Sequence, residues 1–374
     1  MHVTWIQLTL IQPSTKRIPM THSTTPLGVM TQRGPTVLWN DSATRSELAT
    51  SISWGAVGAT CNPVIALSSI RSDLPRWTGR IAELAHELPE ASESEIGWKI
   101  VEEVSLDAAT LLLPAFDAHN GRNGRLSMQT DPRLARSAEA LVAQAEYFSG
   151  LAPNIIVKVP ATEVGVAAIE EATYRGVSIN VTVSFTLAQA LATGEAIERG
   201  LLRREAEGKD TSTMGPVVTL MVGRLDDWLK VVYERDQLCF DPGYLEWAGI
   251  ATFKRAYEEF QARGLRARLL VAAFRNTLQI SELIGGDVVI SPPFAWQRRY
   301  QNGGSPEARM DVPVEQRVLD ALLTMPEFVK AYEPDGLAPS EFLSYGATAR
   351  TLRQFLAADE ELDQIVRDIL VPAP

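Results

Sequence analysis

Short apolar runs alternate with longer helical segments between Thr36 and Ser291, and this alternation constrains the fold more than any other feature of the chain. A helix, or a loop long enough for a crossover, separates each run from the next, which is typical of parallel strands. Eight such units favour a closed (β/α)8 barrel, the TIM-barrel fold. We predict the strands at Thr36–Asn40, Ala56–Thr60, Arg125–Gln129, Ile155–Pro160, Val177–Thr182, Val217–Met221, Arg268–Ala272 and Asp287–Ser291.

The domain organisation follows from the same pattern. A doubly wound open sheet is the alternative fold, but no GxGxxG turn follows the first strand, as that fold would lead us to expect. After residue 291 the pattern indicates helices only, near 318–323, 326–332 and 348–369, and we expect these C-terminal helices to pack on the barrel. Residues 1–30 are interpreted as a disordered or loosely attached leader, and residues 31–374 as a single barrel domain.

The amino-acid composition argues against several classes of function. The formal net charge of −11 argues against a nucleic-acid-binding surface, although a local pair of arginines can still hold a small anionic substrate. Two cysteines and four scattered histidines form no metal-ligand pattern, so we expect neither a metal nor another cofactor. No segment reaches membrane-spanning length. We therefore expect a cytoplasmic protein that does not bind membranes. The sequence is compatible with a homodimer but does not determine the oligomeric state.

Lys158 lies within an apolar, β-branched run that reads as a strand buried on both faces. Burial of the ammonium group removes its hydration, so we expect its pKa to fall and a neutral amine to form. A neutral amine at a strand end can attack a carbonyl carbon and form a Schiff base. The alternative is that the lysine extends its charge past the strand end into solvent, which is common for lysines in such positions.

Polar side chains stand at the ends of the other predicted strands, where the chemistry of a barrel is found. Each has an ordinary structural alternative: Asp41 could cap a helix together with Ser42, Asn62 could be a turn residue before Pro63, and the arginines could be surface groups. Together they suit carbonyl chemistry on a phosphorylated substrate, with paired guanidinium groups on the phosphate. The set is Asn40, Asp41, Thr60, Asn62, Gln129, Asp131, Lys158, Asn180, Thr182, Arg224, Arg275 and Asn276.

Several motifs, in the same order, resemble those of the transaldolase family, within the Schiff-base aldolase superfamily. The match runs from about Thr36 to Ser291, so chance agreement of single short motifs does not explain it. The motifs are Gly58–Pro63 (GATCNP), Lys158–Thr162 (KVPAT), Asn180–Phe185 (NVTVSF) with Ala188–Ala190, Val222–Arg224 with Asp227–Trp228, and Phe274–Asn276.

The resemblance implies a role for each matching residue. Lys158 would form the imine with a ketose phosphate, and Asp41 would act as the acid/base for carbon–carbon cleavage. Thr182 would hold the water that moves protons, next to Gln129. The implied substrate-binding residues are Thr60, Asn62, Asn180, Thr219, Arg224 and Arg275.

Three departures from the family pattern leave the reaction open. Gln129 stands where transaldolases have a glutamate, and an amide cannot accept a proton at neutral pH. The fructose-6-phosphate aldolase branch also has a glutamine there, but it uses a tyrosine where this chain has Met221. Ala273 replaces a phosphate-binding serine. Asp131, two residues after Gln129, could supply a replacement base, although an aspartate before proline is more often a turn residue.

The resemblance leaves three functions to weigh. The first is a transaldolase-type transferase that moves a dihydroxyacetone unit from sedoheptulose 7-phosphate or fructose 6-phosphate to an aldose phosphate. The second is an aldolase that releases free dihydroxyacetone, and an unusual sugar substrate is a further option. The third is a sugar-phosphate-binding or structural barrel without turnover.

Overall fold

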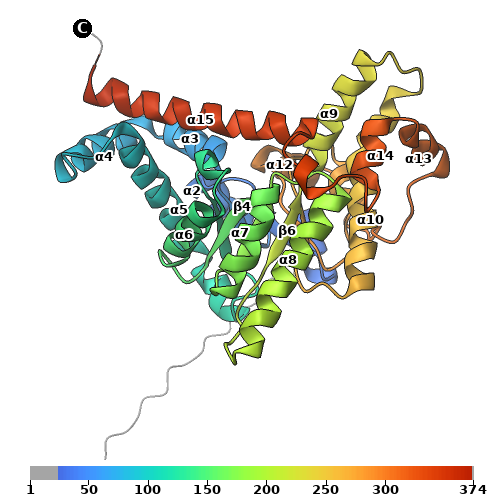
Figure 1. Ribbon diagram of the computed structural model, residues 1–374, viewed down its shortest axis with the longest axis horizontal. Helices are drawn as coiled ribbons and strands as arrows, with labels where there is room; N and C mark the ends of the chain where they lie inside the picture. Colours follow the sequence, from blue (N-terminus) through green and yellow to red (C-terminus); the bar gives the residue numbers. More distant parts are fainter. Residues whose placement is uncertain (1–23, 373–374) are drawn as a thin grey trace, which may run out of the picture.

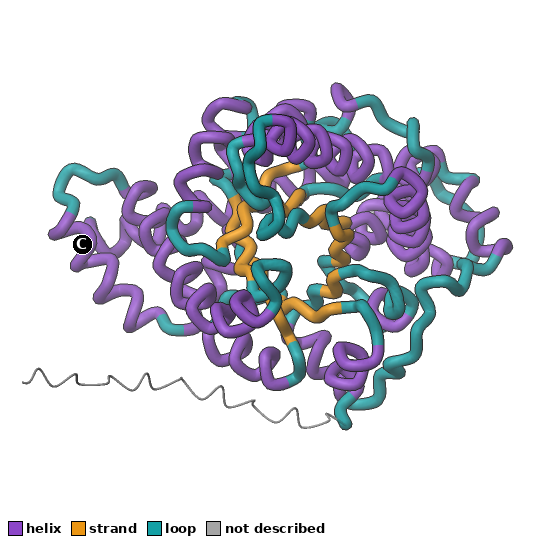
Figure 2. Tube along the Cα trace, turned by 90° about the horizontal axis from the view of Figure 1, so that it is seen from below, coloured by secondary structure: helices purple, strands orange, loops and turns teal. Residues whose placement is uncertain are grey.

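The computed structural model describes residues 24–372, and its centre is a closed barrel of eight parallel strands. The strands follow one another around the barrel in chain order, and β8 closes the ring by pairing with β1. Figure 2 shows the ring of strands with helices around it. This confirms the predicted (β/α)8 barrel. The strands are β1 (Val37–Asn40), β2 (Ala56–Thr60), β3 (Arg125–Gln129), β4 (Ile155–Pro160), β5 (Ile179–Thr182), β6 (Val217–Leu220), β7 (Arg268–Val271) and β8 (Val289–Ile290).

Helices surround the barrel and follow the strands (Figure 1). They are α2 (Arg45–Ser53), α3 (Pro63–Ser72), α4 (Leu74–Glu87), α5 (Glu93–Ala118), α6 (Ala138–Ser149), α7 (Glu163–Tyr174), α8 (Leu187–Ala206), α9 (Val222–Arg235), α10 (Ala248–Arg263) and α11 (Leu278–Ser281). Short 3-10 turns lie at η1 (Pro132–Leu134), η2 (Pro242–Trp247) and η3 (Pro339–Glu341). None of the helices between residues 24 and 372 combines the length and apolar character that a membrane span requires.

Four helices follow β8: α12 (Phe294–Gln301), α13 (Gln316–Leu323), α14 (Pro326–Tyr332) and α15 (Gly346–Leu370). We expected the last three, but neither α12 nor the earlier helix α9. The apolar run of β6 continues directly into α9. Met221 is the N-cap residue of α9, and its side chain makes no capping hydrogen bond. The sequence therefore shows no capping signal at the point where the strand ends and the helix begins.

The chain before β1 forms helix α1 (Pro26–Arg33), whose Leu27 and Met30 are buried in the main core. The backbone N–H of Leu27 donates a hydrogen bond to Gln301 Oε1 at 3.1 Å, so α1 is tied to the end of α12. The final residues of the expected leader, 26–30, thus belong to a packed helix. The rest of the leader, residues 1–23, lies outside the described residues.

Side chains fill the barrel interior in layers. An apolar layer holds Trp39 of β1 together with Ile156, Val217, Leu270 and Val289. Gly58 of β2 makes room for it, because a Cβ at this position would lie 2.4 Å from the Trp39 ring. Residues two positions further along each strand point to the same side, so Lys158 follows Ile156 into the interior. The apolar layer therefore supports the polar mouth from below.

Helix α15 crosses the mouth of the barrel (Figure 1). It packs on α3, η1 and α9, which follow β2, β3 and β6, and it continues over α4 and α5. Arg133 of η1 lies 2.9 Å from the buried carboxylate of Asp359 on α15. Burial first, and then the charge of Asp131, raise the pKa of Asp359 to about 7. The helix thus forms a strap over the strand ends.

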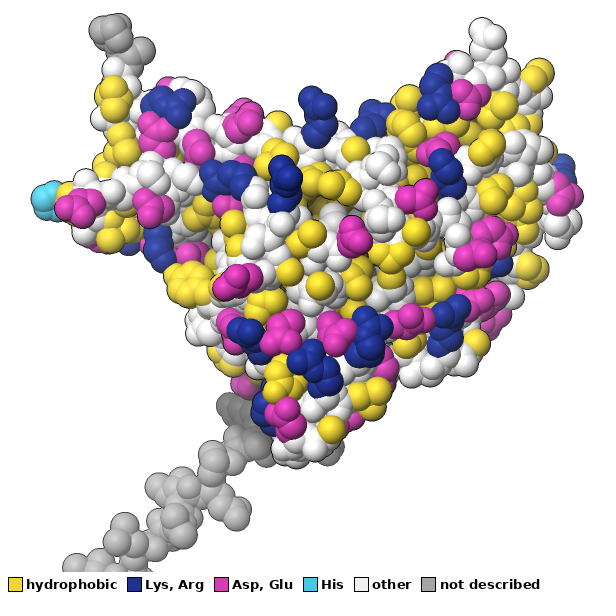
Figure 3. Space-filling view, in the orientation of Figure 1, with side chains coloured by type: hydrophobic (Ala, Val, Ile, Leu, Met, Phe, Trp, Pro, Cys, Tyr) yellow, Lys and Arg dark blue, Asp and Glu magenta, His cyan; other side chains and the backbone are white. Residues whose placement is uncertain are grey.

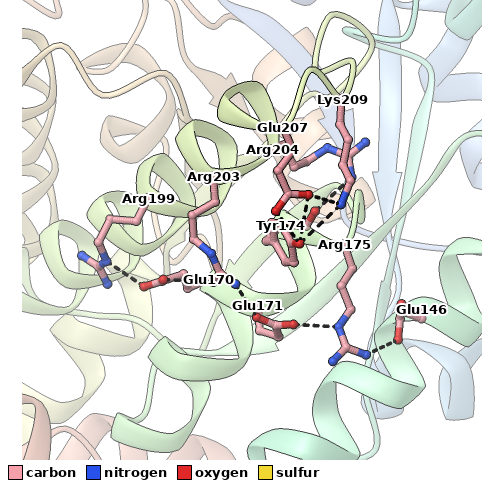
Figure 4. A network of polar contacts seen from close by, with 10 residues as sticks. All are labelled: Glu146, Glu170, Glu171, Tyr174, Arg175, Arg199, Arg203, Arg204, Glu207 and Lys209. Atoms are coloured by element: carbon pink, nitrogen blue, oxygen red, sulfur yellow. Dashed lines mark hydrogen bonds and ion pairs between the residues drawn. The ribbon is translucent and has the colours of Figure 1, made fainter.

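The outer helices α6, α7 and α8 are joined by a surface network of ion pairs (Figure 4). Arg175 lies 2.9 Å from both Glu146 and Glu171, and Arg203 lies 3.0 Å from Glu171. Charged side chains of both signs alternate on this face, over α7 and α8 (Figure 3). Exposed pairs contribute little individually, but Arg175 and Glu171, each of which has two partners, couple the three helices in one network.

Candidate active site

Lys158 lies near the end of β4, and only 5% of its surface is exposed. Burial lowers the pKa of its amine, as the sequence predicted, and the positive charge of Arg224 lowers it further. The charges of Asp41 and Cys61 act in the opposite direction. Within residues 24–372, no side chain forms a hydrogen bond or ion pair with Lys158 Nζ. The lysine does not extend into solvent, and its amine is free to react.

Asp41 follows β1 at the same mouth, where its Oδ1 accepts a hydrogen bond of 2.5 Å from Thr60 Oγ1 of β2. The residue that caps the next helix is Thr44, so Asp41 does not serve as that cap. Its neighbour Asn40 is held from the other side, because Gln297 of α12 donates to Asn40 Oδ1 at 2.7 Å. The structure thus brings Asp41, Thr60 and Lys158 together at one end of the barrel.

Asn180 of β5 is fixed by hydrogen bonds on both sides. Its Nδ2 donates to Ser127 Oγ of β3 at 2.9 Å, and its Oδ1 accepts from Thr219 Oγ1 of β6 at 2.7 Å. It is also the register partner of Lys158. Thr182, two residues further along β5, is 2% exposed and projects to the same side. The residues predicted from strands five and six therefore converge beside the lysine.

Gln129 is the register partner of Lys158 on the other side, at the end of β3. Its side chain is buried, and its Oε1 has no hydrogen-bond partner in the described part of the chain. A buried amide oxygen without a partner is costly, so this oxygen is placed to accept a hydrogen bond from a substrate hydroxyl or a water.

The carboxylate of Asp131 is already engaged in the structure. Its carboxylate forms an ion pair of 2.7 Å with Arg133, and Oδ1 also accepts from the backbone N–H of Arg133 to cap η1. The turn interpretation of this aspartate is confirmed. Asn62 also has a structural role, since its Oδ1 caps α3 by accepting from Ile65 N at 2.9 Å. Its amide nitrogen makes no hydrogen bond to another described residue.

The two predicted arginines follow β6 and β7. Arg275 Nη2 lies 2.7 Å from Asp227 Oδ2, and its Nη1 donates to the backbone oxygens of Ala273 and Phe274 at 3.3 and 3.1 Å. Arg224 donates from Nη1 to Gln354 Oε1 of α15 at 2.7 Å. Burial, followed by the charge of Arg275, lowers the pKa of Arg224 to about 10. Two cations therefore stand close together at the mouth.

Two loops at the mouth contain residues in the left-handed backbone region. Val183, directly after β5, has φ 51°, and Ala273, after β7, has φ 63°. This conformation is strained for a β-branched residue such as valine, and strain of this kind concentrates at functional sites. Buried Gln189 of α8 supports the first loop, since it donates to the backbone oxygens of Val183 and Ala161 and to Thr348 of α15.

Four residues that shape the site were not predicted from the sequence as site residues: Ser127, Gln189, Gln297 and Gln354. Ser127 could have been found, because it lies two positions before Gln129 and so shares its side of the strand. Gln189 lies in a motif of the family resemblance. Gln297 and Gln354 come from helices far along the chain, and nothing in their local sequence points to the barrel mouth.

The charged residues at this site do not form a metal-binding cluster. Within residues 24–372, no group of three or more His, Cys, Asp or Glu side chains is arranged to hold a metal ion. What the arrangement offers is a desolvated amine, a carboxylate and several neutral hydrogen-bonding groups. It defines a (β/α)8 barrel with an amine-centred site at the carboxyl ends of its strands.

Comparison with known proteins shows which family of (β/α)8 barrels the chain belongs to. The model of the transaldolase/fructose-6-phosphate aldolase family matches residues 38–341. A transaldolase of Thiobacillus denitrificans is 29% identical over 321 residues, covering 78% of this chain and 88% of its own length. Transaldolase 1 of Streptomyces coelicolor is 30% identical over 321 residues, covering 76% of this chain and 82% of its own. The chain belongs to the transaldolase/fructose-6-phosphate aldolase family, and it is an enzyme of the transaldolase type.

Proposed function

We propose that the protein is a transaldolase that moves a dihydroxyacetone unit from a ketose phosphate to an aldose phosphate through an imine on Lys158. The observation that carries the proposal is the free, desolvated amine of Lys158, which lies beside the charge of Asp41 at the barrel mouth. An uncharged lysine amine is the form that attacks a ketone. Sedoheptulose 7-phosphate and fructose 6-phosphate are the proposed donors.

The residues act in sequence. Lys158 Nζ attacks the C2 carbonyl of the ketose, water leaves, and an iminium ion forms. Asp41 then takes the proton of the C4 hydroxyl, the C3–C4 bond breaks, and its electrons pass to the iminium nitrogen to give an enamine. The aldose phosphate departs. An acceptor aldehyde is attacked by the enamine, and hydrolysis of the new iminium releases the longer ketose.

The remaining side chains bind and position the substrate. Asn180 is preoriented by Ser127 and Thr219, so its amide is fixed before the substrate arrives. Thr182 and Gln129 flank the lysine from β5 and β3 and hold the water of imine formation and hydrolysis. Thr60 keeps Asp41 in place. Asn62, Arg224 and Arg275 bind the hydroxyls and the phosphate.

An aldolase that releases dihydroxyacetone is the second candidate, because Gln129 cannot accept the proton that a glutamate would take from water. One assay separates the two. Fructose 6-phosphate is incubated with and without erythrose 4-phosphate, and glyceraldehyde 3-phosphate and free dihydroxyacetone are both measured. The transferase forms glyceraldehyde 3-phosphate in repeated turnovers only when the acceptor is present, whereas an aldolase releases dihydroxyacetone without it. Neither product would indicate a barrel without turnover on this sugar.

A cytoplasmic location and a homodimer belong to the same proposal. Both fit an enzyme of sugar-phosphate metabolism without a metal or cofactor. Cell fractionation tests the location, and sedimentation of the purified protein tests the dimer. A monomer would leave the mechanism unchanged, since every residue assigned a role comes from one chain.

A further inference from the structure

Two buried arginines lie at the opposite end of the barrel from the candidate active site. Arg125 begins β3 and Arg268 begins β7, and only 3% and 8% of their surfaces are exposed. Leu270, two residues after Arg268, belongs to the apolar layer of the interior, so Arg268 lies beneath that layer on the same side of its strand. We call Arg125 and Arg268, with the loops that they contact, the barrel floor.

Both side chains reach across the floor to the far side of the ring. Strands β3 and β7 are four places apart in the ring of eight, so they face each other. Arg125 Nη2 donates to the backbone oxygen of Thr213, in the segment before β6, at 2.5 Å. Arg268 Nη2 donates to the segment before β3, at 2.8 Å to the backbone oxygen of Arg122 and at 3.1 Å to Asn123 Oδ1. The two guanidinium groups therefore approach each other from opposite sides.

All the hydrogen-bond partners of these two cations are uncharged. Arg125 also donates from Nε to Gly121 O at 2.7 Å, and within residues 24–372 no carboxylate lies within ion-pair distance of Arg125 or Arg268. Asp287, whose charge acts on Arg268, is already paired with Arg122. Burial, followed by the charge of Arg268, lowers the pKa of Arg125 to about 10. Two buried charges of the same sign without a counterion are costly, and an anion between them would remove that cost.

Donors remain free on both guanidinium groups. Nη1 of Arg125, and Nε and Nη1 of Arg268, have no hydrogen-bond partner in the described part of the chain. Solvent reaches these three nitrogens, since none of them is among the enclosed polar atoms that lack a partner. Gly215 leaves space beside Arg125, because a Cβ at this position would lie 3.0 Å from Arg125 Nε. The floor thus offers unused N–H groups that are open to a small ion.

We propose that the barrel floor binds a small oxyanion of the phosphate or sulfate class between Arg125 and Arg268. An anion with several oxygens accepts hydrogen bonds from two guanidinium groups at once. The chain as a whole carries a net charge of −11, so this pair of cations is not part of a generally basic molecule. The bound ion ties the start of β3 to the start of β7 and so stabilises the folded barrel. The proposal does not rest on the proposed function.

Anomalous diffraction distinguishes an anion on the floor from one at the mouth. Crystals of the full chain would be soaked in sodium selenate, a sulfate analogue whose selenium scatters anomalously. We expect a selenium peak between the guanidinium groups of Arg125 and Arg268. A peak at the mouth alone, or no peak, would overturn the proposal.

Binding in solution is measured as the rise in Tm with added sodium phosphate, compared with sodium chloride at equal ionic strength. An ion that binds only the folded protein raises Tm by mass action. Every protein in this series carries Arg224→Gln and Arg275→Gln, which removes the cations at the mouth. The parent should show the rise if the floor is the site. No rise in this parent would mean that a floor peak in the crystal reflects binding at crystal concentration only, and would overturn the proposal.

Arg268→Met then tests the floor itself, since it removes one guanidinium and keeps an unbranched side chain. We expect the apparent phosphate affinity to fall roughly tenfold or more. The matched control is Arg266→Met, at a partly exposed arginine that pairs with Glu198 and Glu205, and it should respond like the parent. The readout is the phosphate-dependent rise, so a lower Tm of the variant itself does not affect it. If Arg268→Met does not fold, Arg268→Lys keeps the charge but loses the planar fork, and should also bind more weakly. A rise of the parental size in the floor variant would contradict the proposal.

Discussion

Gln129 and Lys158 are register partners on β3 and β4, so a neutral amide lies beside the buried amine at the centre of the site. A glutamate at position 129 would place a negative charge next to the lysine. The neutral amide does not stabilise the ammonium form of Lys158, so burial keeps the pKa of the lysine low. We thus attribute part of the reactivity of the amine to the identity of residue 129.

Gln129→Glu should raise the pKa of Lys158, because an adjacent carboxylate stabilises the ammonium form. We expect the pH midpoint of imine formation to move upward by about one unit. The measurement is the rate of cyanoborohydride trapping with dihydroxyacetone as a function of pH, with Gln261→Glu as the control for an added charge. An unchanged midpoint would show that residue 129 does not act on the amine.

In the wild type, the rate of imine formation should rise with pH and level off below pH 10.5, the ordinary pKa of a lysine. The sign follows from the mechanism: the neutral amine reacts, and burial of Lys158 favours the neutral form. Removing the nearby positive charge with Arg224→Gln should move the midpoint upward. A wild-type midpoint at or above 10.5 would mean that the amine is not desolvated in solution.

Asp41→Asn should separate imine formation from cleavage. The variant retains Lys158 and loses the base that accepts the C4 hydroxyl proton, so turnover should fall by about 10²–10⁴-fold. Trapping with fructose 6-phosphate should then give an adduct of the intact six-carbon sugar. Thr60→Val, which removes only the hydrogen bond to Asp41, serves as a milder comparison. A three-carbon adduct in Asp41→Asn would assign the proton transfer to another group.

Gly223→Ala should disturb the loops that carry the two arginines. A Cβ at this position would lie 1.9 Å from the backbone oxygen of Ala273 and 2.8 Å from Arg275 Cγ, so the β7 loop must move. We expect a loss of about 1–3 kcal/mol in the free energy of unfolding and a higher KM for fructose 6-phosphate. Gly79→Ala is the matched control, because nothing lies within 4 Å of its Cβ. Equal denaturation midpoints for the two variants would contradict this packing.

The barrel could be predicted because its strands are continuous apolar runs with a regular spacing. The predicted run at 56–60 coincides with β2, and 125–129 coincides with β3. The first residues of β5 and β8 were less predictable. The predicted strands begin at Val177 and Asp287, but β5 begins at Ile179 and β8 at Val289. Local sequence indicates that a strand is present, but pairing with its neighbours decides where the strand begins and how many residues belong to it.

The site could be predicted in part for the same reason. Strand ends identify Asp41, Asn180 and Lys158 as neighbours, since parallel strands place their carboxyl ends together. The contacts of α15 could not be predicted, because Gln354 is 130 residues from Arg224 and nothing nearby in sequence marks it. The sequence alone also does not distinguish a base from a turn residue at Asp131. The ion pair with Arg133 depends on the folded structure.

The most direct test of the central proposal is borohydride trapping with fructose 6-phosphate, followed by mass spectrometry of the digested protein. Our account predicts a three-carbon adduct on the peptide that contains Lys158, and no adduct in Lys158→Met. This result would establish the imine and the cleavage step together. No adduct with either fructose 6-phosphate or sedoheptulose 7-phosphate, or an adduct on a different lysine, would contradict the proposed mechanism.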